Sequence, residues 1–300
     1  MKVIIAAAIT FAALTASANA AWPERPVTII VNSAPGGGAD LLARTLADGF
    51  TQALGQRAVV ENKPGAGGNI AGAQVARAAP DGYTLLLADS GMLAINPTLY
   101  PSMPFNPKSD FTHISRVAAF SIAIAAHPST GIRSIDDLAA KAKASPGKIT
   151  FASTGIGSPQ HLAAVMLQKA AGIQMEHVPY RGGGPALTDL IGGHVMVGFI
   201  GIPPLAPVIR DGRLNGLGVT STARSKTLPD VPAVAERYPG FEAQVWFALV
   251  APKSLPGEIG MRLASVVQDT LRRSETVELM DKQGFTAFLS NASELSSYLD

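Results

Sequence analysis

Residues 27–47 read VTIIVNSAPGGGADLLARTLA, and this stretch indicates the fold of the whole chain. Val27 to Val31 form an apolar, β-branched run that is typical of a buried strand. The turn formers 35–38 end that run, and from Asp40 onward apolar and charged residues alternate at helical spacing. Because the first turn of a helix carries unpaired N–H groups, glycines before it let an anion approach the backbone. The stretch therefore predicts a strand, a glycine loop and a helix, with a binding site for a carboxylate or phosphate at the loop.

The glycine loop does not match the nucleotide-binding motifs. The dinucleotide fingerprint requires G-x-G-x-x-G or a final alanine, and Leu41 stands at the third glycine position after Gly36 and Gly38. No G-x-x-x-x-G-K-[ST] sequence occurs anywhere in the chain. Nucleotide binding is therefore disfavoured. The alternative to an anion-binding site is that the glycines only form a tight turn between the strand and the helix.

The first 20 residues have the organisation of a secretory signal peptide. Lys2 precedes an apolar run from Val3 to Leu14, and Ala18-Asn19-Ala20 forms a small-residue cleavage site. We expect cleavage after Ala20 and a mature chain that starts at Ala21. The apolar run is too short to span a membrane, and no later stretch reaches about 18 apolar residues without charges or turn formers. The sequence therefore predicts a soluble, exported protein.

The composition excludes several kinds of site. The 300 residues contain no cysteine, so disulfides, a lipid-anchored cysteine and cysteine-ligated metals are excluded. With 47% hydrophobic and 15% charged residues, the chain can bury one large core or two smaller ones. The formal net charge is only +2 and no run of Lys or Arg occurs, so nothing indicates nucleic-acid binding.

The pattern of strand, loop and helix recurs along the chain. Glycine-rich or small polar loops follow further short apolar strands, and most of them lead into helical segments. The predicted strands are 58–61, 83–88, 148–152, 175–179, 195–200 and 214–220. The predicted helices are 70–78, 134–144, 161–170, 185–191, 256–272 and 275–282. This alternation predicts an α/β fold with mostly parallel sheets, in which ligands bind at the carboxyl ends of the strands.

Six stretches in a fixed order resemble one known family. They are APGGGADLLAR (34–44), VENKPGAGGNIAGAQVARAAPDGYTLLLA (60–88), the pair Asn96-Pro97, PFNPKSDF (104–111), STGIGSPQHL (153–162) and VPYRGGGPALTDLIGG (178–193). Together they resemble the substrate-binding proteins of tripartite tricarboxylate transporters, the Bug-type periplasmic solute receptors. The resemblance covers nearly the whole mature chain, and the combination of motifs is highly specific.

The resemblance implies a two-lobed type II periplasmic-binding-protein fold, each lobe a mostly parallel sheet flanked by helices. The chain would cross between the lobes twice, and the two longest apolar segments, 117–126 and 241–251, fit those crossings. The implied division is a signal peptide (1–20), lobe 1 (22–123 plus 247–300) and lobe 2 (124–246). The resemblance also implies a periplasmic monomer without cofactor or metal, which captures a di- or tricarboxylate, an acidic amino acid or an aromatic acid. Such a receptor would deliver its ligand to the membrane permease subunits.

The residues expected to bind the ligand lie in loops of both lobes. By the resemblance, the ligand loops correspond to 34–40 and 153–158, with Ser90 and the turn 182–184 as further wall. The expected ligand-binding residues are Ala34, Gly36, Gly37, Gly38, Asp40, Ser90, Ser153, Thr154, Gly157, Ser158, Arg181, Gly182 and Gly183. Hydroxyl groups and an arginine suit a carboxylate because they donate hydrogen bonds to it. Each has a structural alternative, since Asp40 and Ser158 also suit a helix cap and an exposed arginine is usually just solvated.

Two other functions stay open at this point. An exported enzyme would use His161 as a base for Ser158, but the chain has no G-x-S-x-G elbow and no evident third member of a triad. The other histidines are scattered and no H-E-x-x-H occurs, so metal catalysis is not indicated. A receptor that feeds a sensor instead of a permease has the same sequence signature as a transport receptor.

Overall fold

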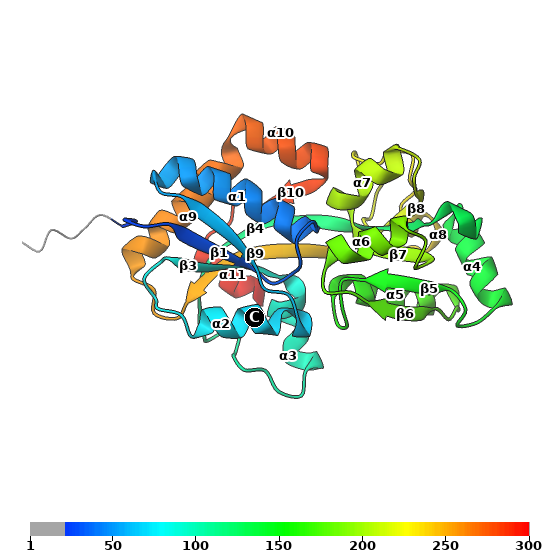
Figure 1. The fold of residues 1–300 in the computed structure, drawn as a ribbon, viewed down its shortest axis with the longest axis horizontal. Helices are drawn as coiled ribbons and strands as arrows, with labels where there is room; N and C mark the ends of the chain where they lie inside the picture. Colours follow the sequence, from blue (N-terminus) through cyan, green and yellow to red (C-terminus); the bar gives the residue numbers. More distant parts are fainter. Residues whose placement is uncertain (1–21, 300) are drawn as a thin grey trace, which may run out of the picture.

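The computed structural model describes residues 22–299, and the predicted signal peptide lies outside the described residues. Two α/β lobes lie side by side along the long axis of the molecule (Figure 1). Their strands form one continuous mixed sheet in the order β2-β1-β3-β9-β4-β7-β5-β6, and β8 and β10 also pair with β4. Within this described part, no helix is long and apolar enough to cross a membrane.

The first lobe is built on the stretch quoted at the outset. β1 (Val27–Val31) pairs in parallel with β2 (Ala58–Asn62) on one side and β3 (Thr84–Asp89) on the other. α1 (Gly38–Leu54) follows the glycine loop and ends at Gly55, whose positive φ of 67° is a common helix terminator. The other elements of this lobe are η1 (Ala66–Gly68), α2 (Asn69–Ala76), a π-helical turn η2 (Gly91–Ile95), α3 (Asn96–Leu99), α9 (Gly257–Arg272), α10 (Ser274–Gln283), β10 (Phe285–Ala287) and α11 (Ala292–Leu299).

The second lobe repeats the parallel arrangement. β5 (Thr150–Ser153) lies between β6 (Glu176–Pro179) and β7 (Val197–Gly201), parallel to both. Its other elements are η3 (Pro128–Thr130), α4 (Ile135–Ala144), α5 (Pro159–Ala171), α6 (Gly183–Ile191), α7 (Ile202–Arg210), β8 (Asn215–Val219) and α8 (Val234–Arg237). The prediction of α4 is confirmed, because the Ser134 hydroxyl caps the helix by accepting the Asp137 N–H at 3.0 Å.

Helix α7 was not predicted, because its sequence contains three prolines. Pro203 and Pro204 stand in the first turn, where a helix has unpaired N–H positions and tolerates proline. Pro207 lies inside the helix and removes one hydrogen bond, yet most of this helix is buried in its lobe. Tertiary packing thus outweighs the local cost of proline.

Two long strands connect the lobes. β4 (Phe111–Ala126) pairs with β9 (Gln244–Pro252) over residues 111–121, and then with β7 and β8 over residues 122–126. All of these ladders, and that of β9 with β3, are antiparallel. The predicted two-lobed α/β fold is confirmed, but the sheet is mixed rather than mostly parallel because these crossing strands run against their neighbours. The residue boundaries of the lobes stay a prediction.

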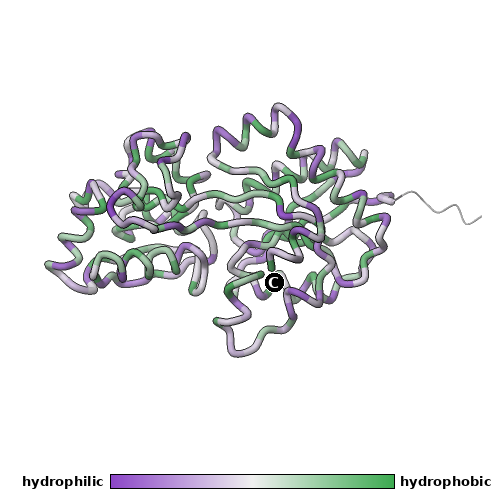
Figure 2. Tube along the Cα trace, turned by 180° about the vertical axis from the view of Figure 1, so that it is seen from behind, coloured by the Kyte–Doolittle hydropathy of each residue, from purple (hydrophilic) through white to green (hydrophobic). Residues whose placement is uncertain are grey.

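The apolar residues gather around the strands. Figure 2 shows hydrophobic segments in the middle of both lobes and hydrophilic segments along the outer helices and loops. The largest fully buried side chains include Phe50, Phe151, Phe199 and Phe247. The largest cluster of buried apolar residues runs through both lobes along the shared sheet, and the loops at the strand ends form the walls between the lobes.

Candidate functional site

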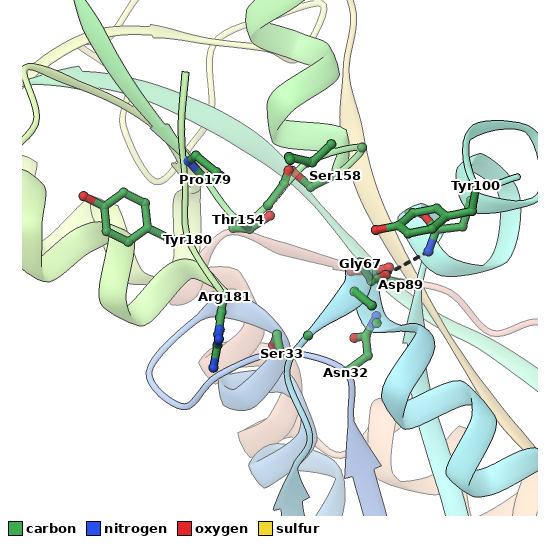
Figure 3. A pocket seen from close by; sticks show the side chains of 18 residues that line it. Asn32, Ser33, Gly67, Asp89, Tyr100, Thr154, Ser158, Pro179, Tyr180 and Arg181 are labelled. Atoms are coloured by element: carbon green, nitrogen blue, oxygen red, sulfur yellow. Dashed lines mark hydrogen bonds between the residues drawn. The ribbon is translucent and has the colours of Figure 1, made fainter. Parts of the chain in front are cut away.

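A cavity of about 230 Å³ lies between the two lobes (Figure 3). Its walls come from loops and strand ends at the carboxyl ends of β1, β2 and β3 in lobe 1 and of β5 and β6 in lobe 2. The lining residues are Asn32, Ser33, Gly65, Ala66, Gly67, Gly68, Asp89, Gly91, Asn96, Tyr100, Thr154, Gly155, Ile156, Gly157, Ser158, Pro179, Tyr180 and Arg181. Since one liquid water takes about 30 Å³, the cavity suits a small metabolite and lies below the range of about 300–1,000 Å³ of drug-sized pockets.

The predicted binding residues divide into three groups. Thr154, Gly157, Ser158 and Arg181 line the 230 Å³ cavity. Gly37, Gly38, Gly183 and again Thr154 line a neighbouring space of about 30 Å³. The residues that line neither space are Ala34, Gly36, Asp40, Ser90, Ser153 and Gly182.

The two glycine-rich turns, 35–38 in lobe 1 and 182–184 in lobe 2, pack directly against each other. A Cβ atom on Gly37 would lie 3.1 Å from a backbone nitrogen of the other turn. A Cβ atom on Gly184 would overlap the carbonyl oxygen of Pro35. Glycine is required here because backbone meets backbone at the lobe boundary. We refer to this contact as the glycine contact.

A backbone hydrogen bond adds to the glycine contact. The Ala34 N–H donates to the carbonyl oxygen of Arg181 at 3.0 Å, so the segment before one turn is bonded to the segment before the other. At Gly182 a Cβ atom would lie 2.8 Å from the Ala34 nitrogen. Ala34 and Gly182 therefore join the lobes in this structure, where the sequence predicted that they contact the ligand.

The Asp40 carboxylate is turned to its own lobe. It accepts hydrogen bonds from the Gly36 N–H at 3.1 Å, from Arg44 through two nitrogens at 3.0 Å and from the Asn62 amide at 3.1 Å. Burial by itself would raise the pKa of Asp40, but the hydrogen bonds from Arg44 and its other partners lower it below the usual value. Asp40 thus fixes the glycine turn 35–38 to the first turn of α1. The negative charge of Asp40 is neutralised by Arg44.

The loop 153–158 is held by hydrogen bonds within lobe 2. The Ser158 hydroxyl caps α5, accepting the His161 N–H at 3.1 Å and donating to the Gly155 carbonyl at 2.7 Å. The Thr154 hydroxyl donates to Gln160 at 2.9 Å. The predicted capping alternative for Ser158 is confirmed, and Thr154 and Ser158 line the cavity from this hydrogen-bonded loop.

Two histidines stack behind this loop. The rings of His161 and His177 lie 4.0 Å apart and nearly parallel, and the buried Ser153 hydroxyl lies 2.7 Å from His177 Nε2. Burial and the neighbouring His161 lower the pKa of His177 to about 4. The ring nitrogen Nδ1 of His161 accepts the Gly157 N–H at 3.2 Å and not the Ser158 hydroxyl. The pairing of Ser158 with His161 that an enzyme would need is therefore not formed.

None of the residues predicted to bind ligand from lobe 1 lies in the lobe 1 wall of the 230 Å³ cavity. Asn32 follows the last residue of β1, Asp89 is the last residue of β3, and the loop 65–68 follows β2. These residues follow or end parallel strands, and ligands in α/β folds bind at the carboxyl ends of such strands. This position could have identified them as cavity residues from the sequence. Ser90, which was predicted instead of its neighbour Asp89, is buried outside the cavity, and within residues 22–299 its hydroxyl has no hydrogen-bond partner.

The fold and the position of the cavity define a class of protein: a two-lobed solute-binding receptor with its site between the lobes. The family model described as the tripartite tricarboxylate transporter family receptor (TctC) matches residues 42–300. The chain belongs to this family, which consists of receptors and not of enzymes.

Individual relatives agree over nearly the whole chain. Protein BugT of Bordetella pertussis is 37% identical over 280 residues, which cover 93% of this chain and 86% of BugT. The structure of R. palustris Rpa4515 with adipate has a TM-score of 0.90 at 30% identity and covers 93% of each chain. MatC from Rhodopseudomonas palustris, with bound malate, has a TM-score of 0.86 at 28% identity and covers 93% of this chain and 96% of its own.

Proposed function

We propose that this protein is an exported receptor that captures a small organic carboxylate in the interlobe cavity and delivers it to a tripartite tricarboxylate-type permease. The observation that supports this most is the cavity itself, which neither lobe encloses alone. Arg181 in its wall can donate two parallel hydrogen bonds to a carboxylate. The adipate and malate bound to two relatives belong to the same chemical class.

The proposed contacts come from both lobes. Thr154, Gly157, Ser158 and Arg181 would meet the ligand from lobe 2, and Tyr100 with the loop 65–68 would meet it from lobe 1. Because the ligand then bridges the lobes, it stabilises the arrangement in which the glycine contact is formed. The ligand can shift this equilibrium only by its difference in affinity for the closed and open forms.

Binding can be tested on the mature protein with a thermal-shift and calorimetric screen of succinate, adipate, L-malate, citrate, benzoate and L-aspartate. A ligand at a hundred times its Kd adds about 2.7 kcal/mol to the stability of the folded state, which raises Tm by several degrees. Dimethyl succinate, which has no charge, should have no effect. Chromatography after overnight incubation should recover the bound acid unchanged.

Arg181→Gln should weaken binding of the best acid by about 10- to 100-fold, as expected for the loss of a hydrogen bond between charged groups. Arg133→Gln is the matched control, since Arg133 is exposed on lobe 2 and away from the cavity. If no carboxylate of the screen binds, or if the acid is consumed, the proposal is wrong.

Delivery to a permease is distinguished from signalling by deleting the receptor in its host. Loss of uptake of the bound acid supports a transport role. Uptake that continues while the transcriptional response to the acid disappears would instead show a sensor partner. Osmotic-shock release of the protein would support the proposed periplasmic location.

A further inference from the structure

One aromatic side chain separates the ligand cavity from larger spaces on the outside of lobe 1. Tyr100 follows the last residue of α3 and lines the 230 Å³ cavity together with Ala66. The same two residues line an open groove of about 560 Å³ beside α2. Tyr100 also lines a third space, of about 820 Å³, beside the segment 101–108. The Tyr100 ring thus stands where the cavity would otherwise continue into open grooves.

The position of Tyr100 is fixed by its neighbours. Asn96, the first residue of α3, is buried, and its side-chain amide donates to the Gly67 carbonyl oxygen at 2.9 Å. The Tyr100 N–H donates to the Asn96 carbonyl oxygen at 2.9 Å, and Pro101 restricts the backbone of the residue before it. A Cβ atom on Gly67 would lie 2.8 Å from the Tyr100 hydroxyl oxygen. The ring therefore reaches from α3 to the loop 65–68 and closes the gap between them.

The neighbouring residue closes the same end of the cavity against lobe 2. A Cβ atom on Gly157 would overlap the Cδ2 methyl group of Leu99, so Leu99 packs directly on the loop 153–158. Figure 3 shows Tyr100 and Arg181 on opposite sides of the cavity. A ligand whose carboxylate lies at Arg181 therefore extends toward Tyr100 as its chain becomes longer.

We infer that Tyr100 sets the length of the acid that the receptor accepts. The inference rests on the proposed carboxylate-binding function and adds a residue that determines specificity. In the wild-type protein the ring ends the cavity, so a longer chain meets space that is already filled, where added methylene groups are unfavourable. Without the ring, the cavity would open into the groove beside α2. Ile70, which lines that groove and is 53% exposed, would then be covered by the chain of a longer acid.

The test measures affinity along series of acids whose successive members differ by one methylene group. Calorimetry on the mature protein would use the dicarboxylates from malonate to sebacate, the monocarboxylates from acetate to decanoate, and the phenyl acids from benzoate to 4-phenylbutyrate. In the wild-type protein the affinity should fall by about tenfold or more between two successive members of the best series. In Tyr100→Ala this fall should move to acids that are longer by about two methylene groups or more, because the substitution leaves space where the ring was.

Three further variants make the comparison specific. Tyr100→Phe keeps the ring and should keep the wild-type length limit. Tyr100→Leu has a shorter side chain and should move the limit in the same direction as alanine, which decides the test if the alanine variant does not fold. Tyr238→Ala is the matched control, since Tyr238 follows α8 in lobe 2 and does not line the cavity. It should leave the limit unchanged.

Several outcomes would overturn the inference. A wild-type protein that binds all lengths equally, or the same limit in Tyr100→Ala and Tyr100→Leu, would do so and leave the carboxylate receptor intact. A longer limit in Tyr100→Phe or in Tyr238→Ala would show that the Tyr100 ring is not what ends the cavity. If no acid of these series binds, the inference is wrong, and the carboxylate receptor is wrong with it only if the earlier screen also finds no ligand.

Discussion

Replacing Gly184 by alanine should separate lobe closure from lobe folding. Gly184 lies in the first turn of α6, and its φ does not fall in the left-handed region, so alanine suits its backbone conformation. The added methyl group would overlap the Pro35 carbonyl oxygen of the opposite lobe. Because the obstructing atom is backbone, it cannot be displaced by a change of rotamer. The strain is relieved by moving the two lobes apart.

The size of the effect follows from the cost of overpacking. Inserting a methyl group into a packed contact costs about 1–3 kcal/mol. If the open form escapes this strain, the closed form is disfavoured by that amount, and the apparent affinity falls by about 5- to 150-fold. The stability of each lobe should change little, since the contact lies between them.

The assay measures ligand affinity and lobe distance on the same variants. The chain has no native cysteine, so single cysteines at Gln74 on α2 and Val165 on α5 can carry a fluorescent donor and acceptor. Calorimetry with the best acid of the screen gives the Kd, and energy transfer gives the distance with and without ligand. Gly257→Ala is the control, because a Cβ atom there meets nothing within 4 Å.

Three results would refute this reasoning. Wild-type affinity in Gly184→Ala would show that the glycine contact does not belong to the bound state. An unchanged distance on adding saturating ligand to the wild-type protein would show that the cavity is preformed and that closure does not contribute to binding. Loss of the folded structure in the variant, seen by circular dichroism, would show that the contact is needed for folding itself.

Three further changes test other parts of the structure. Ser158→Ala should lower the unfolding free energy in urea by about 1 kcal/mol, as for a lost helix cap, and no loss would contradict the capping role; a tenfold drop in affinity would show direct ligand contact as well. The pKa of His177 is lowered to about 4, so from pH 6.5 downward the unfolded state is protonated first and stability should fall until about pH 4. After allowance for solvent screening this loss is about 1–2 kcal/mol, and it should shrink in His177→Gln but not in the exposed control His194→Gln. The pKa of Asp40 is lowered from 3.8, so its contribution is present above that pH and is lost as the pH falls through the folded value; Asp40→Asn should cost about 2 kcal/mol at pH 7 and less at pH 3, and an equal cost at both would contradict the charge pairing with Arg44.

Sequence by itself determined the α/β class, most elements and one side of the cavity. Apolar periodicity, glycine loops and caps such as Ser134 are local properties, because they depend on residues within one or two helical turns. The loop 153–158 is also local: it lies between β5 and the cap of α5, so Thr154, Gly157 and Ser158 could be placed at the cavity in advance. The order of motifs along the chain then indicated the family.

Only the tertiary structure decided what the glycines of 35–38 face. A glycine before a helix can contact either a bound anion or the backbone of another segment. Which of the two it contacts depends on the turn 182–184, which comes far later in the chain. The same limit applies to Asp40, whose partner Asn62 lies on another strand. It also applies to the hydrogen bond that the Asn32 amide donates to Asp89, because adjoining parallel strands bring the two residues together. A local sequence pattern does not specify which distant segments pair. The polar groups that line the cavity could therefore be identified only from the register of the strands in the tertiary structure.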